Sequence, residues 1–233
     1  MTTSGTAAFN PSITEIMEEA YERAGLELRS GYDIKTARRS LNILAAEWSN
    51  RGLNLWTIEQ GTQTLTPGTA TYTLPSDTID LIEHVCRTTV NGSPTDLTMS
   101  RISVSDYSAI PTKGTQGRPV QIYVNRQATP QFTVWPVPDS STTYTVVYWR
   151  LRRIQDATSG ANPSGDNTFD IPSRFIPAII AGLAYYIAMK KPDAADRISM
   201  LKQIYEEQFQ LAADEDRDRA SDRFVPFVGY NWT

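Results

Sequence analysis

The segment PAIIAGLAYYIAM at residues 177–189 is the most apolar run of the chain, and it decides the fold. It is shorter than the roughly 20 residues that a helix needs to span a bilayer, so we expect a buried helix and no membrane span. Pro172 opens the predicted helix, which runs to about Lys190. Its own apolar side chains point to nearly all sides, which predicts a central place among other helices. These side chains are Phe175, Ile176, Ile179, Ile180, Leu183, Tyr186 and Ile187.

Two helices are predicted near the N-terminus. Ser12 and Glu15 form a capping-box signature, and Gly25 suits the position just past a helix end, so we expect a helix over residues 12–24. A second helix is expected over residues 33–50, and the short link between the two favours an antiparallel hairpin. The apolar stripe of the second helix consists of Ala37, Leu41, Leu44, Ala45 and Trp48.

The middle of the chain, residues 53–155, is rich in Thr, Val, Ile, Tyr and Trp, with Gly and Pro between the runs. This texture predicts strands. Asn91-Gly92 is a strong signal for a two-residue hairpin turn, and residues 103–119 are expected to form a loop. The predicted strands cover residues 55–60, 62–66, 71–74, 79–90, 95–99, 121–125, 131–135 and 143–151.

The chain ends with a helix and a tail. After a Lys-Pro-Asp break at residues 191–193, a narrow apolar stripe predicts a helix over residues 193–214. A very polar run follows and leads to an aromatic-rich end, which we expect to be an extended docking peptide for another chain. Its alternative is a tail folded back on its own subunit. The docking residues would be Phe224, Val225, Phe227, Val228, Tyr230 and Trp232.

Together these elements predict an α+β fold. The N- and C-terminal helices would form a four-helix bundle, with an antiparallel β module inserted between them and an extended tail at the end. The expected divisions are a helical hairpin at residues 1–52, a β-rich module at 53–170, the C-terminal helices at 171–216 and the docking tail at 217–233. The polar loop at residues 156–168 is long enough to be functional, and we expect it at a contact with another subunit or protein.

Composition and charge exclude several function classes. The formal net charge of the 233 residues is −4, whereas proteins that grip a phosphate backbone carry a basic excess. We therefore expect no specific binding of nucleic acid, although an acidic wall could still let DNA slide past, because like charges repel. The lone Cys86 and lone His84 would share a strand face, but no third metal ligand is visible. No nucleotide-binding or hydrolase motif is present, so we expect no enzyme, no cofactor and no metal.

Three arginines, Arg150, Arg152 and Arg153, close the last predicted strand, and Arg150 and Arg152 would share one face. They are candidates for contact with DNA or with an acidic partner, and ordinary solvated ends, with ion pairs between subunits, are the alternative. Arg38-Arg39 on the second helix leave the same two possibilities open. Aromatic residues of the β region suggest a β core more strongly than a sugar-binding platform: Phe132, Trp135, Tyr144, Tyr148 and Trp149.

The order of elements, and several phrases within it, resemble the head-to-tail adaptor family of short-tailed bacteriophages. Tyr72, Leu74, Pro75 and Asp77 match a Y-x-L-P-x-D turn of that family. The resemblance covers about residues 12–213. The phrases that carry it are ARRSLNILAAEWSNRGLNLWTIEQ (37–60), TATYTLPSDTIDLIE (69–83), GRPVQIYVNR (117–126), VWPVPD (134–139) and TFDIPSRFIPAIIAGLAYYIA (168–188).

The resemblance implies a ring, expected to hold twelve subunits, that joins the phage portal to the tail nozzle and forms part of the DNA-ejection channel. The helices would dock on the portal, and the aromatic tail would dock on the portal or on a neighbouring chain. The β module would face the nozzle, with the loop at residues 156–168 at a subunit or nozzle contact. Contacts with the channel or with another subunit would involve Arg150, Arg152 and Arg153. Twelve chains would carry a charge of about −48, which suits a channel to which DNA does not stick. The N-terminus has no signal-peptide character, so we expect a soluble protein that is made in the host cytoplasm and assembled into the virion at the head-tail junction.

Other functions remain open at this point. A nozzle or fibre-attachment protein is one, although nozzles are usually much longer chains. A β-rich module for sugar or receptor binding would leave the four helices unexplained. A cell-wall-degrading tail enzyme would need two carboxylates in a cleft, whereas the visible acidic clusters at residues 18–19 and 214–218 are expected on solvated helix faces.

Overall fold

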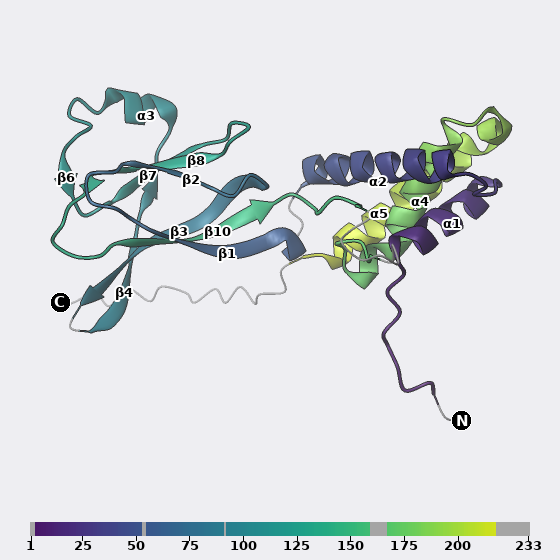
Figure 1. Ribbon diagram of the computed structural model, residues 1–233, viewed down its shortest axis with the longest axis horizontal. Coiled ribbons are helices and arrows are strands. Elements are labelled where there is room, and N and C mark those ends of the chain that lie inside the picture. The colour runs from purple at the N-terminus through teal and green to yellow at the C-terminus, as the bar shows by residue number, and fades with distance from the viewer. Residues whose placement is uncertain (1–2, 53–54, 91, 159–166, 218–233) are drawn as a thin grey trace, which may run out of the picture.

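The computed structural model describes residues 3–52, 55–90, 92–158 and 167–217. Helices α1 (Ile13–Ala24), α2 (Gly31–Arg51), α4 (Ile176–Ala188) and α5 (Ile198–Glu215) gather at one end of an elongated molecule (Figure 1). The β-sheets lie at the other end, together with the short helix α3 (Val104–Ala109). The chain leaves the helical end after α2, builds the sheets, and returns to that end after β10 (Thr145–Arg152). The predicted mixed α+β architecture, with N- and C-terminal helices that pack together beside central sheets, is thereby confirmed. Within the described ranges, no helix combines the length and the apolar character that a bilayer crossing requires.

The first helix, α1 (Ile13–Ala24), begins and ends as its sequence predicts. The Ser12 hydroxyl accepts a hydrogen bond from the backbone N–H of Glu15, and the Glu15 carboxylate accepts one from Ser12 N–H at 2.7 Å. These two bonds satisfy N–H groups that have no partner within the helix. Gly25 ends α1 with φ 75°, a left-handed conformation that costs glycine little. The second helix, α2 (Gly31–Arg51), starts from Ser30, whose hydroxyl caps Asp33.

The apolar helix α4 (Ile176–Ala188) lies at the centre of the helical part. It is preceded by the 3-10 turn η2 (Ser173–Phe175) and is followed by η3 (Pro192–Arg197) and α5 (Ile198–Glu215). A Cβ on Gly182 of α4 would lie 2.8 Å from Leu44 of α2 and 2.9 Å from the Tyr205 ring of α5. The missing side chain therefore lets two neighbouring helices approach α4 closely.

α1, α2 and α5 each pack on α4. α1 and α2 touch each other little, although a short link joins them, so they are not the closely paired hairpin that the link suggested. The reason lies in their buried faces: both helices direct their apolar side chains toward α4, which is apolar on nearly all sides. The tight contact of α2 with α5 is aromatic, with the Trp48 and Phe209 rings 5.3 Å apart.

The β part holds two four-stranded sheets and a short two-stranded one. One sheet has the order β1-β10-β3-β4 and is antiparallel throughout. The other has the order β2-β8-β7-β5. The bounds are β1 (Ile58–Thr64), β2 (Thr71–Thr73), β3 (Thr78–Val90), β4 (Ser93–Thr98), β5 (Ser100–Arg101), β6 (Gln116–Gly117), β7 (Gln121–Asn125), β8 (Gln131–Trp135), β9 (Val137–Pro138) and β10 (Thr145–Arg152).

The structure corrects three sequence expectations in this part. The first two predicted strands are one strand, β1, which is preceded by the 3-10 turn η1 (Leu55–Thr57). The expected loop contains helix α3 (Val104–Ala109), because Ser103 and Asp106 form a second capping box. The module is not purely antiparallel, since β5 pairs with β7 and β6 with β9 in parallel. These pairs are only two residues long, too short to leave a pattern in the sequence. The predicted Asn91-Gly92 turn fits the pairing of Val90 with Ser93, although Asn91 lies outside the described residues.

The two larger sheets share one apolar core, which is separate from the helical core. Phe132 of β8 and Tyr148 of β10 meet across it with ring centroids 6.4 Å apart. The expectation that the aromatic residues fill a β core is confirmed for Phe132, Tyr144 and Tyr148, which are buried. Trp135 and Trp149 are only half-buried. Cys86 and His84 also lie buried on β3, as their alternation predicts.

Candidate interaction surfaces

The end of β10 carries a network of ion pairs at the junction between the sheets and the helices. Arg150 donates from Nη1 to Asp77 Oδ1 at 2.6 Å and from Nη2 to Glu59 Oε2 at 2.8 Å. Arg152 donates from Nε to Glu59 Oε1 at 2.6 Å and from Nη1 to Asp170 Oδ2 at 2.5 Å. Glu59 therefore bridges the two arginines, and Asp170 joins the strand to the segment just before α4.

The ion pairs shift the pKa values of Asp77 and Arg152. Hydrogen bonds from Arg150 hold the pKa of Asp77 below its usual range. The hydrogen bond to Asp170 raises the pKa of the Arg152 guanidinium, which stays charged. Asp170 also accepts from the backbone N–H of Gln155 at 3.0 Å. Paired charges of this kind fix one geometry, because a partner left alone would be a costly, partly buried charge.

All three strand-end arginines thus have partners within their own chain, although the pair of Arg153 with Asp156 is long, at 3.9 Å, and exposed. The side chains of Arg150 and Arg152 are 11% and 8% exposed, whereas that of Arg153 is 58% exposed. Irregularities in the pairing of β10 with β3 follow Trp149 and Leu151, yet both arginines still reach Glu59. A role for the three arginines in channel or subunit contacts stays a prediction, and Arg153 is the one that solvent reaches freely.

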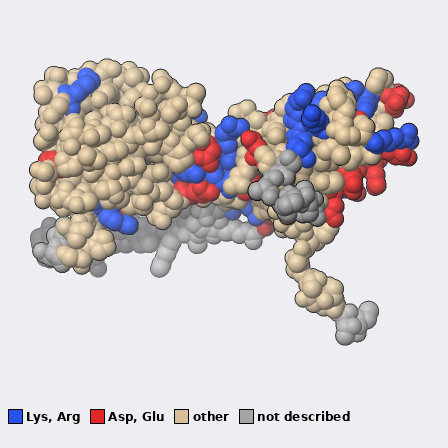
Figure 2. Space-filling model, viewed as in Figure 1, with Lys and Arg blue, Asp and Glu red and all other residues tan. Residues whose placement is uncertain are grey.

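Arg153 lies beside α2 and completes a basic surface there. It shares a groove of about 400 Å³ with Lys35, Arg38 and Arg39 of α2, together with Asn42, Ile43, Ala46 and Asp156. The contact is fixed by a hydrogen bond from the Ala157 N–H to Asn42 Oδ1 at 2.7 Å. Basic side chains gather over α2 in Figure 2. The sequence predicted the basic cluster of α2 and that at the end of β10 separately. Nothing in the sequence indicates that residues more than 100 positions apart lie side by side.

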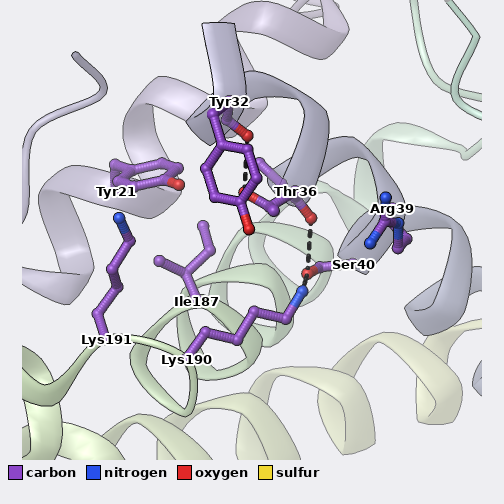
Figure 3. Close-up of a pocket in the computed structure, with 9 residues that line it drawn as sticks. Tyr21, Tyr32, Thr36, Arg39, Ser40, Ile187, Lys190 and Lys191 are labelled. Atoms are coloured by element: carbon purple, nitrogen blue, oxygen red, sulfur yellow. Dashed lines mark hydrogen bonds between the residues drawn. The ribbon is translucent and has the colours of Figure 1, made fainter. Parts of the chain in front are cut away.

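A second pocket, of about 380 Å³, opens between α1, α2 and the end of α4 (Figure 3). Lys190 donates to the Ser40 hydroxyl at 2.5 Å, and Lys191 pairs with Asp33 at 2.8 Å. Burial, and then repulsion from Arg39, lower the pKa of the Lys190 amine. The hydrogen bond from Lys191 lowers the pKa of Asp33. Sequence reasoning missed this pocket, since its lysines were assigned only to a helix break.

Other candidate sites do not assemble. Burial lowers the pKa of His84 and raises that of Cys86, so both are neutral core residues at pH 7. Among the described residues, no three His, Cys, Asp or Glu side chains come together as metal ligands would. The acidic cluster at residues 214–218 was expected on a solvated helix face, but its Asp216 side chain is only 3% exposed. Asp216 pairs with Arg174 and accepts a hydrogen bond from the Leu55 N–H.

Two predicted sites fall outside the described residues. The docking-tail residues Phe224, Val225, Phe227, Val228, Tyr230 and Trp232 lie there. So do residues 159–166 of the long loop. The described ends of this loop are anchored, because Ile13 N–H donates to Asn167 O at 2.8 Å and Ala157 is buried.

Comparison with known protein families gives a match over most of the chain. The sequence model of the SU10 adaptor protein family matches residues 13–228, which include every helix described above and both larger sheets. No curated protein matches the chain. The match spans most of the sequence, and it agrees with the resemblance to head-to-tail adaptors. The chain belongs to the SU10 adaptor protein family, a family of phage head-tail adaptors.

Proposed function

We propose that the protein is a ring-forming adaptor that joins the phage portal to the tail nozzle and lines part of the DNA-ejection channel. The family match over residues 13–228 carries this proposal. Membership in an adaptor family makes the chain a structural component of the phage particle rather than a catalyst. Our proposal is more specific than this family role in four respects: the ring, its twelve copies, its contacts with the portal and the nozzle, and its place at the head-tail junction.

The separation of the chain into a helical part and a β module supports separate binding roles for the two parts. The helices at residues 1–52 and 171–216 would act as a four-helix bundle that docks on the portal. The β module at residues 53–170 would face the nozzle. The Arg150–Glu59–Arg152–Asp170 network joins the end of β10 to the segment before α4. These ion pairs would hold the helices and the β module of each subunit in one relative orientation within the ring.

The acidic charge of the chain supports passage of DNA without capture. A net charge of −4 per subunit, repeated around a ring, repels a phosphate backbone on average. Native mass spectrometry of the adaptor bound to the portal of the same phage tests the ring. We expect about twelve adaptor chains per complex, as the resemblance implies. A stable complex of one adaptor with one portal chain would contradict the proposal.

We propose further that the aromatic tail at residues 217–233 docks on the portal or on a neighbouring chain. Large apolar side chains of this kind stabilise a contact by roughly 1.5–3 kcal/mol each when fully buried. Deletion of residues 224–233 should leave the melting temperature of the free protein unchanged and weaken binding to the portal. A lower melting temperature with normal portal binding would mean that the tail folds on its own subunit.

A further inference from the structure

The exposed side of α2 is basic and has no carboxylate of its own. From Lys35 to Ala46 the helix carries three cations and no acidic residue. In the part of the chain that the structure describes, Lys35, Arg38 and Arg39 form no ion pair. The Arg38 Nε is buried, and none of the described residues accepts a hydrogen bond from it. We call Lys35, Arg38, Arg39 and Arg153 the α2 basic surface.

Part of the groove beside these cations is apolar. Ile43 is 49% exposed and lines the same groove as the four cations, together with Ala46. An apolar patch with a charged rim is the usual anatomy of a protein contact. Asp156 lines the same groove and pairs with Arg153 at 3.9 Å. The three cations of α2 have no such pair among the described residues and repel one another, so an acidic partner would relieve that repulsion.

The exposed side of α1 has the opposite charge. From Ile13 to Glu22 this helix carries four carboxylates and no cation. Glu18 and Glu22 are exposed, and neither is paired within the described ranges, whereas Glu19 pairs with Arg23 at 2.8 Å. Acidic side chains gather over α1 in Figure 2, apart from the basic side chains over α2. We call Glu15, Glu18, Glu19 and Glu22 the α1 acidic surface.

We propose that the α2 basic surface of one copy docks on the α1 acidic surface of a second copy. α1 and α2 both bury their apolar sides against α4, so their charged sides face away from the shared core. A contact between two different patches leaves one free patch at each end, and it therefore continues into a chain or closes into a ring. The inference rests on the proposed ring and names the surfaces that build it. Complementary charge sets the register of such a contact and speeds its formation.

Charge reversal tests the proposal. One variant carries Arg38→Glu with Arg39→Glu, and the other carries Glu18→Lys with Glu22→Lys. Sedimentation velocity of the full chain at low salt should show self-association that weakens as salt is added. Each variant alone should associate at least about tenfold more weakly than the natural chain. An equal mixture of the two should recover association, because each supplies the charge that the other lacks.

The control changes the same number of charges elsewhere. Arg29→Glu with Lys202→Glu alters exposed cations that lie outside both surfaces, and its self-association should match that of the natural chain. Circular dichroism melts check that all variants fold. The acidic-side variant is decisive here, because Glu18 and Glu22 are exposed and their replacement does not disturb the core.

Three results would overturn the inference. They are a natural chain that stays monomeric at low salt and high concentration, variants that associate normally, and a mixture that fails to recover. If another partner occupied the α2 basic surface, the basic-side variant would lose that partner while self-association stayed normal. None of these results would remove the adaptor role, which the stoichiometry of the portal complex decides separately.

Discussion

Gly182 is the point where the packing of the helical part can be tested with one methyl group. In an open helix, Gly→Ala stabilises a protein by about 1 kcal/mol. Here the new Cβ would lie 2.8 Å from Leu44 Cδ2 and 2.9 Å from Tyr205 Cε2, closer than carbon atoms pack. The Tyr205 ring has little freedom to move, because its hydroxyl accepts from Trp48 Nε1 at 2.8 Å and donates to Glu47 at 3.2 Å.

Overpacking of this kind costs about 1–3 kcal/mol of stability. Because the Tyr205 ring is held in place, we expect the cost at Gly182 to lie toward the upper end of that range. After the helix-propensity gain, we expect Gly182→Ala to lower the free energy of unfolding by about 1–2 kcal/mol. The melting temperature should fall by about 2–8 °C. Thermal and urea unfolding followed by circular dichroism measure both quantities.

Gly31→Ala is the matched control. A Cβ at Gly31, the first residue of α2, meets no atom within 4 Å. Its stability should stay within about 0.5 kcal/mol of the natural chain. If Gly182→Ala proved as stable as Gly31→Ala, the close approach of α2 and α5 to α4 would not be the reason for a glycine in the central helix.

Three further predictions concern the β module and its junction. Arg152→Met should lower the free energy of unfolding by about 1–3 kcal/mol, because Glu59 and Asp170 lose a hydrogen-bond donor. Arg153→Met, which changes the exposed neighbour, should leave the free energy of unfolding nearly unchanged. Equal effects of the two variants in urea unfolding would argue against the network. Arg150 lowers the pKa of Asp77 in the folded chain. The pair therefore stabilises the fold fully above the pKa that Asp77 has in the unfolded chain, and this stabilisation is lost as the pH falls through the pKa of Asp77 in the folded chain. Asp77→Asn should therefore lose less stability than the natural chain between about pH 5 and pH 2, and identical pH profiles would exclude this pair as a source of acid sensitivity. Gly61→Ala should lower the melting temperature, since its Cβ would lie 2.5 Å from the Tyr148 ring, whereas an unchanged melting temperature would show that the ring moves freely.

The helical part followed closely from the sequence, because its signals are local. Ser12, Glu15 and Gly25 lie within one short segment, and the structure uses each of them as predicted. The apolar character of α4 predicted its central position for a similar reason, since a helix without a polar side has to be surrounded. Helix α3 carries the same capping signal at Ser103 and Asp106, but its six residues have no buried side.

The interaction surfaces could not be predicted because they join distant segments. Arg153 reaches α2 only through the anchored ends of the long loop, where Ala157 donates to Asn42. The network around Arg152 likewise depends on the pairing of β1 with β10 and on the approach of Asp170. The basic clusters were visible in the sequence as charges, whereas their neighbours depend on the complete fold.

Cryo-electron microscopy of the phage head-tail junction tests the central claim most directly. We expect a ring of about twelve copies beneath the portal, with the helices of the adaptor against the portal and its sheets toward the tail. A map in which this fold lies elsewhere in the particle, or in which no ring of it separates portal from tail, would contradict the account.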